Sequence, residues 1–135
     1  MKYTVWQIQY SEKDIETINN GGFNPRYESR MAMTMDFKDN RIGSIANDAI
    51  MAGLYTHVAD ITADTPEHCF QIGNIGPESN IMRITRMSSL SVGDVIIDSD
   101  GQCLVIANFG FIAFSYKPEM SAANLTYHFE MGEAV

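Results

Sequence analysis

Apolar and polar residues alternate with a period of two in several short stretches of the chain. Such alternation, in segments rich in β-branched and aromatic residues, is typical of strands with one buried face. The pattern predicts strands at residues 3–10, 54–63 and 124–131. Apolar runs predict two more at 92–98 and 102–109, a third strand is expected to follow at 111–116, and residues 81–87 are expected to be extended. Methionines at 31, 33 and 35 alternate in the same way, so a further strand is expected within residues 23–38.

Three segments carry the features of helices instead. Ser11 followed by Asp14 is the sequence of a capping box and predicts a short helix. Residues 40–52 place apolar side chains at the spacing of an amphipathic helix and end before a glycine. Thr65 as the cap and Pro66 at the first helical position predict another helix, because the missing N–H of proline is harmless there.

The order of these elements indicates the fold class. Ser99-Asp100-Gly101 lies between two apolar runs and predicts the turn of a β-hairpin. Two or three short helices among six or seven strands indicate an α+β fold, with a mostly antiparallel small sheet or a partial barrel. A chain of 135 residues is of the usual size for one domain and buries roughly two thirds of its unfolded surface. Residues 1–135 are therefore expected to form a single domain.

Composition changes this picture little. Hydrophobic residues make up 45% and charged residues 19%, which is typical of globular proteins. Cys69 and Cys103 each sit inside an apolar run, where a buried thiol is the common state, and a reducing compartment fits best. The start of the chain lacks the features of a signal peptide, and no apolar run approaches the ~20 residues needed to span a bilayer. We therefore expect a cytoplasmic protein with no membrane partner.

Charge narrows the class of partner. The net charge is −8, and all of it arises from residues 42–135. Such a surface repels phosphate backbones, so direct binding of nucleic acid is not expected. A basic protein, or a protein that normally binds nucleic acid, is a better match. The acidity can equally serve solubility alone.

The hydroxyl groups before residue 95 do not form a catalytic pattern. Ser88, Ser89 and Ser91 lack the strained elbow and the neighbouring base that an activated serine needs. The run from Ser91 to Asp94 suits a tight turn in which side-chain oxygens satisfy backbone N–H groups. The glycines fit neither a Walker-type loop nor a dinucleotide-binding loop. We therefore expect no enzymatic activity.

Metal ligands at familiar spacings are also missing from the sequence. His57, His68 and His128 have no partners at the spacing of zinc sites. Asp94 and Asp98 are too far apart for the alternating ligands of a calcium loop. No metal or other cofactor is expected, and His57 is interpreted as a half-buried histidine of a sheet.

Residues Asp64 to Phe114 carry a resemblance to a known family. They combine a short helix containing a phenylalanine and an asparagine, a loop, the run SLSVGDVI, an Asp-Gly turn, an apolar strand and a Gly-Phe pair. This arrangement resembles the YodL-like domain family of phages and bacterial mobile elements, on about residues 64–114. The matching residues are Phe70, Asn74, Ser89, Leu90, Ser91, Val92, Gly93, Asp94, Val95, Gly101, Gly110 and Phe111. The family often has Ser-Val-Ser-Asp where this chain has Ser-Val-Gly-Asp, a departure also found in what looks like its phage branch.

The resemblance implies an accessory protein of a phage or mobile element that acts in the host cell. It provides no catalytic residues, and Ser89, Ser91, Asp94 and Asn74 are its candidate ligand- or partner-binding residues. We expect a non-enzymatic protein that binds a host protein, and a homodimer stays open. The alternative is a protein that binds or sequesters a small, nucleotide-like ligand at the serine and aspartate rim.

Overall fold

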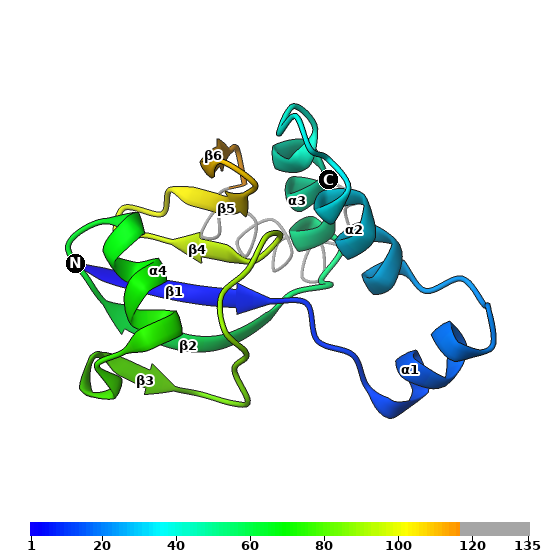
Figure 1. The fold of residues 1–135 in the computed structure, drawn as a ribbon, viewed down its shortest axis with the longest axis horizontal. Coiled ribbons are helices and arrows are strands. Elements are labelled where there is room, and N and C mark those ends of the chain that lie inside the picture. The colour runs from blue at the N-terminus through cyan, green and yellow to red at the C-terminus, as the bar shows by residue number, and fades with distance from the viewer. Residues whose placement is uncertain (117–135) are drawn as a thin grey trace, which may run out of the picture.

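The computed structural model describes residues 1–116 and contains four α-helices and a six-stranded sheet (Figure 1). The strands are β1 (Lys2–Gln7), β2 (Thr56–Thr62), β3 (Ile81–Arg83), β4 (Val95–Ile97), β5 (Cys103–Ala107) and β6 (Gly110–Phe114). The helices are α1 (Glu12–Asn19), α2 (Pro25–Thr34), α3 (Ile42–Met51) and α4 (Pro66–Ile75), with a short 3₁₀ helix, η1 (Glu78–Asn80).

The sheet has the order β3-β2-β1-β4-β5-β6, and every neighbouring pair is antiparallel. The expected α+β class with an antiparallel sheet is therefore confirmed. The sheet does not close into a barrel, so of the two forms expected, a small sheet or a partial barrel, the small sheet describes it. Two or three helices were also too few, because a fourth helix, α2, forms where a strand was predicted.

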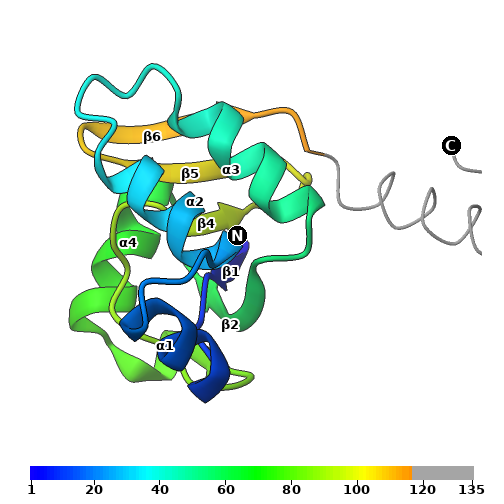
Figure 2. The same ribbon diagram turned by 90° about the vertical axis from the view of Figure 1, so that its right-hand side faces the viewer.

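Helices cover both faces of the sheet, and each face has its own hydrophobic core (Figures 1 and 2). Helix α4 packs on one face through Cys69 and Ile72. Helices α2 and α3 pack on the other face, where Met33 and Ile42 are fully buried. The middle strands β4 and β5 are buried on both faces, which explains why they read in the sequence as continuous apolar runs.

Of the methionines that predicted a strand, Met31 and Met33 lie in helix α2 and Met35 is its C-cap. Asn24 caps this helix by accepting a hydrogen bond from the backbone N–H of Tyr27, and a proline follows at the first position. Met31 and Met35 are exposed and Met33 is fully buried. Residues four positions apart share a face of a helix, and the residue midway between them points to the other side. Spacing by two residues was therefore compatible with a helix as well as with a strand.

Several local predictions are confirmed in the described residues. The capping box of α1 is present in both directions, between the Ser11 side chain and Asp14 N and between the Asp14 side chain and Ser11 N. The β4–β5 turn is closed by Asp98, whose Oδ1 accepts from the backbone N–H groups of Asp100 and Gln102 at 2.9 Å each. The predicted strand at 124–131 lies outside the described residues.

The two cysteines are buried on opposite faces of the sheet. Cys69 belongs to the core under α4 and Cys103 to the core under α3. Burial raises the pKa of the Cys69 thiol to about 12. This thiol is therefore protonated and unreactive at neutral pH. Among the helices of residues 1–116, none has the length and apolar character to cross a membrane.

Gly110→Val is expected to lower the free energy of unfolding by about 2 kcal/mol, because Gly110 starts β6 at φ +92°, which side-chain-bearing residues adopt only with strain. A Cβ atom there would meet no atom within 4 Å, so the cost is purely conformational. Urea unfolding measures it. The control is Ala113→Val on the same strand, expected to stay within about 0.5 kcal/mol of the original protein. Equal tolerance of the two substitutions would contradict the prediction.

Candidate functional site

Loop 84–94 connects β3 to β4 and brings a carboxylate to the C-terminal end of β1. Asp94, at the end of this loop, is 1% exposed. Three side chains or backbone groups surround it and come from different parts of the chain: Gln7 of β1, Arg30 of α2 and Ser91 of the loop itself. We call these four residues the Asp94 cluster.

Gln7 joins the end of β1 to the loop. Its Oε1 accepts from Ser88 N at 3.0 Å, and its Nε2 donates to Ser88 O at 3.0 Å and to Asp94 Oδ2 at 3.1 Å. The amide therefore pairs with the backbone of Ser88 much as a neighbouring strand would. Since Gln7 is buried, each of these bonds replaces one that water would make in the unfolded chain.

Arg30 approaches Asp94 from helix α2. Its Nη2 donates to Ser91 Oγ at 2.9 Å, and its Nη1 lies 3.5 Å from Asp94 Oδ1 without forming a hydrogen bond. The backbone N–H of Ser91 donates to Asp94 Oδ2 at 2.9 Å. One carboxylate oxygen is thus bonded twice, while within the described part of the chain the buried Oδ1 has only the longer ionic contact.

Burial raises the pKa of Asp94 to about 6, against the opposing effects of the Ser91 N–H, Arg30 and Gln7. Burial disfavours the charged form of a carboxyl group, and hydrogen bonds to that form favour it. Here the loss of solvent outweighs the bonds. A buried carboxyl group with a pKa near neutrality beside an open cleft is a common feature of functional sites, although structural clusters produce it too.

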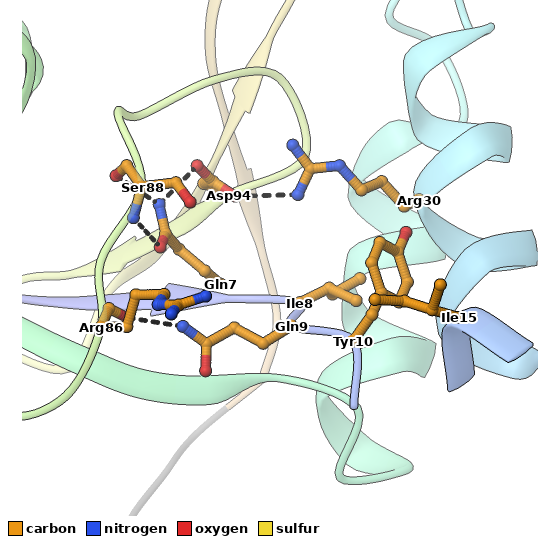
Figure 3. A pocket seen from close by; sticks show the side chains of 9 residues that line it. All are labelled: Gln7, Ile8, Gln9, Tyr10, Ile15, Arg30, Arg86, Ser88 and Asp94. Atoms are coloured by element: carbon orange, nitrogen blue, oxygen red, sulfur yellow. Dashed lines mark hydrogen bonds and ion pairs between the residues drawn. The ribbon is translucent and has the colours of Figure 1, made fainter. Parts of the chain in front are cut away.

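A cleft of about 600 Å³ opens beside the Asp94 cluster (Figure 3). Its lining residues are Gln7, Ile8, Gln9, Tyr10, Ile15, Arg30, Arg86, Ser88 and Asp94. Arg30 and Arg86 enter it from different sides, and Tyr10 and Ile15 lie next to Arg30. Gln9 Nε2 donates to Arg86 O at 2.5 Å and holds that part of the loop against the end of β1. Within residues 1–116, the Arg86 guanidinium makes no hydrogen bond or ion pair.

The four predicted site residues do not form one site. Ser91 and Asp94 belong to the Asp94 cluster. Ser89 and Asn74 line a separate hollow of about 240 Å³ next to α4. Asn74 Nδ2 donates to Leu90 O at 3.2 Å and Asn74 Oδ1 accepts from Leu90 N at 2.5 Å, so this side chain fixes the loop to the helix.

A tyrosine fixes the loop from its other side. The Tyr55 hydroxyl, at the start of β2, donates to Gly93 O at 2.6 Å and lies 3.5 Å from Met33 Sδ. Burial raises the pKa of Tyr55 far above its usual range, so it remains a hydrogen-bond donor at neutral pH. Loop 84–94 is thus held by side chains of β1, α2, α4 and the segment before β2.

The geometry does not assemble a nucleophile and a base. Ser91 Oγ accepts a hydrogen bond from an arginine, and none of the residues that line the 600 Å³ cleft is a histidine. His57 lies on β2, stacked on Trp6 with ring centroids 4.9 Å apart and hydrogen-bonded to Asp60 at 2.7 Å. In residues 1–116 there is no group of three or more His, Cys, Asp and Glu side chains that could hold a metal ion.

Sequence reasoning missed three residues of this site: Gln7, Arg30 and Arg86. A signal existed for Gln7, which follows Tyr3 and Val5 on the inward-facing positions of β1 and is the only polar residue among them. A polar side chain at an inward position requires a partner. Arg30 and Arg86 gave no such signal, because helix α2 was predicted as a strand and loop side chains follow no period.

The free energy of unfolding should fall as the pH rises from about 4 to about 6, because of Asp94. Its pKa is higher in the folded than in the unfolded chain, so the folded state binds more protons in this range. Relative to Asp94→Asn, the original protein should lose up to about 3 kcal/mol of unfolding free energy between about pH 4 and about pH 7. Urea unfolding across this range measures the difference.

Asp48→Asn, at an exposed position of α3, controls for the loss of one negative charge. If the original protein instead gains stability over Asp94→Asn as the pH rises, the ion pair with Arg30 outweighs burial and the argument fails.

Comparisons with known proteins add no further constraint. Neither a family model nor a curated protein nor a solved structure matches the chain significantly. The resemblance of residues 64–114 to the YodL-like family stays a prediction. Inference about function therefore depends on the Asp94 cluster and the surfaces around it.

Proposed function

We propose that the protein acts by binding without turnover, and that the cleft beside the Asp94 cluster captures a small anionic ligand. One observation carries this proposal: two arginines line the same cleft in a chain of net charge −8. One of them, Arg86, has no ionic partner among the described residues. In the sequence analysis, a small-ligand site at the serine and aspartate rim was the alternative function. The proposed site is instead the cleft, which shares Asp94 with that rim.

The charged side of the cleft suits a carboxylate or a phosphate. A guanidinium group presents several N–H donors in a planar fork that matches either anion, and such charge-assisted bonds are stronger than neutral ones. Arg30 already donates to Ser91 and neutralises part of the Asp94 charge. Arg86 is therefore the group whose charge is available to a ligand.

The other side of the cleft is apolar. Ile8, Tyr10 and Ile15 line it next to α1, and its volume of about 600 Å³ lies within the range of roughly 300 to 1,000 Å³ of small-molecule sites. An anionic group with an aromatic or aliphatic body matches both sides. Nucleoside monophosphates combine these features, and a nucleotide-like ligand was the alternative drawn from the sequence.

The biological setting is a second part of the proposal and depends on the resemblance alone. The SLSVGDVI motif supports an accessory protein of a phage or mobile element that acts in the cytoplasm of a host cell. Sequestering a small anion would be one such role, and it requires no catalytic group.

Nucleoside monophosphates should raise the melting temperature of the protein, whereas the neutral nucleosides should not. A ligand present at about 100 times its dissociation constant stabilises the folded state by roughly 2.7 kcal/mol. Arg86→Gln should weaken the effect about tenfold or more, because it removes a charge-assisted hydrogen bond. Arg41→Gln, an identical change outside the cleft, should leave it intact.

Inorganic phosphate in the same assay separates recognition of the charge from recognition of the whole ligand. No shift with any anion, or a shift that survives in Arg86→Gln, would refute binding at this cleft.

A second candidate function, binding of a basic host protein, has its own supporting observation. Acidic side chains gather at the end of the sheet where β1 begins, opposite the cleft. Burial raises the pKa of Tyr3 in β1, with further contributions from Cys69, Asp98, Glu67 and Asp64. We call Asp64, Glu67 and Asp98 the acidic end. These carboxylates from three different segments offer a surface for a basic partner.

The double variant Asp64→Asn/Glu67→Gln should capture several-fold less of a basic partner from a bacterial lysate than the original protein. This difference should shrink as the salt concentration rises, because salt screens the carboxylates that the variant removes. Asp98 is left in place because it closes the β4–β5 turn. Asp48→Asn/Glu28→Gln makes the same change of charge elsewhere and should keep the partner. Recovery of no specific protein at low or physiological salt would argue against this function.

A further inference from the structure

The sheet has two edge strands, and they differ in how well they are protected. Strand β3 has three residues, and its Arg83 forms an ion pair with Glu78 at 2.6 Å. Short, charged edges resist pairing with another chain. Strand β6 has five residues, Gly110–Phe114, and none of them is charged. Within residues 1–116, no strand pairs with the outer side of β6.

The free backbone groups of β6 can be identified from its neighbour. Ile106 of β5 donates its N–H to Asp94 O and accepts at its carbonyl from Gly93 N, both at 2.8 Å. Both of its backbone groups are thus used on the side away from β6. In an antiparallel pair, two residues that face each other point their backbone groups either toward each other or away from each other. Phe111 faces Ile106, whose groups point away from β6, so Phe111 directs its N–H and C=O outward. By alternation Ala113 does the same.

Hollows flank β6 on both faces of the sheet. One, of about 430 Å³, lies between β6 and helix α3, which run side by side in Figure 2. The other, of about 460 Å³, lies on the α4 face and is lined by Phe70, Leu90 and Phe111 among others. A strand added to an edge points its side chains alternately to the two faces. These hollows stand where such side chains would go.

Two features of the α3-side hollow indicate what it would bind. Asn47 lines it, and its Oδ1 atom is buried and has no hydrogen-bond partner among residues 1–116. A buried acceptor without a donor is costly, so a ligand that supplies a donor is favoured. Asp39 is the only charged residue in the lining, and it is acidic. The hollow therefore matches a segment with a polar donor and a neighbouring basic side chain.

We propose that β6 binds an extended segment of a partner protein as a seventh strand. The segment pairs with the outward backbone groups of Phe111 and Ala113, places alternate apolar side chains in the two hollows, donates to Asn47 Oδ1 and carries Lys or Arg near Asp39. Addition of a strand to a sheet edge is a general mode of peptide recognition. This site is independent of the cleft and of any ligand there.

A second copy of the chain is a poorer occupant of the edge. Each copy carries a net charge of −8, so two copies repel each other. A contact limited to two five-residue strands also falls short of the roughly 1,000 Å² that a specific interface needs. A basic peptide avoids the repulsion and can extend beyond the strand on both sides.

Selection from a display library of random peptides of about ten residues on the full chain tests the proposal. Enriched peptides should alternate apolar and polar residues and carry Lys or Arg. Ala113→Pro removes the outward N–H of residue 113 without removing a β5–β6 hydrogen bond, so it should weaken the best peptide about tenfold or more. Ala113→Ser keeps this N–H and should bind like the original protein.

The peptide itself provides a test that does not depend on the folding of Ala113→Pro. N-methylation of alternate peptide residues on the pairing side should abolish binding, and methylation of the opposite set should not. In amide-exchange NMR, the bound peptide should protect the N–H groups of Phe111 and Ala113. No enriched peptide, binding that survives both sets of N-methylation, or protection of these amides in the free protein would overturn the proposal. A dimer abolished by Ala113→Pro would overturn it in favour of a second copy.

Discussion

The buried carboxylate of Asp94 is the constraint on which the rest of the structure depends. Ionised carboxylates are expensive to bury, and this one is 1% exposed. Its cost is offset by two N–H donors on Oδ2 and by the guanidinium of Arg30. Removing one of these partners would leave a buried charge with less compensation, which costs more than removing the whole cluster. The cluster therefore determines where Gln7, α2 and loop 84–94 can lie.

This constraint also explains why a cleft exists at this end of β1. The side-chain amide of Gln7 bonds to both backbone groups of Ser88 and therefore lies between the loop and β1. The loop cannot pack closer to this strand. Arg30 must reach Asp94 from α2, which keeps that helix at a distance from the loop. Tyr10, between β1 and α1, and Ile15, on α1, line the space that remains. The cleft is thus a consequence of how a buried charge is satisfied, and one of its two arginines, Arg30, is placed by the same requirement.

How far the sequence predicts this protein depends on whether the signal is local. The capping box at Ser11, the turn held by Asp98 and the apolar strands β4 and β5 are fixed by residues within a few positions of one another. Helix α2 was predicted wrongly because methionines two apart fit two periods, and only the burial of Met33 distinguishes them. In the site, Ser91 and Asp94 were found through their turn.

Gln7 and Arg30 could not be assigned to the site in the same way. They are separated from Asp94 by 87 and 64 positions, and no local pattern encodes a contact over that distance. The interpretation of side-chain oxygens as ties for the main chain fits Asp94, whose Oδ2 accepts from Ser91 N. It does not fit the Ser91 hydroxyl, which accepts from the Arg30 side chain. Ser89 and Asn74 were grouped with Ser91 through the family resemblance, but Asn74 lies on α4 and Ser89 lines the hollow next to that helix. The fold therefore separates residues that the resemblance had placed together.

Asp94 also connects the cleft to the far edge of the sheet, through its main chain. Its carbonyl accepts from Ile106 N, and this bond sets the direction of the β5 amides and hence which groups of β6 face outward. The main chain of Asp94 is fixed by that pairing, whereas the 3.5 Å contact with Arg30 is the only one that its Oδ1 makes with a polar group of residues 1–116. A ligand that moves Arg30 would rearrange the side chain and leave the backbone in place. Coupling between two sites requires an element with two arrangements that both sites influence. The backbone of residues 93–94 does not meet this requirement, so the cleft and the β6 edge should bind independently.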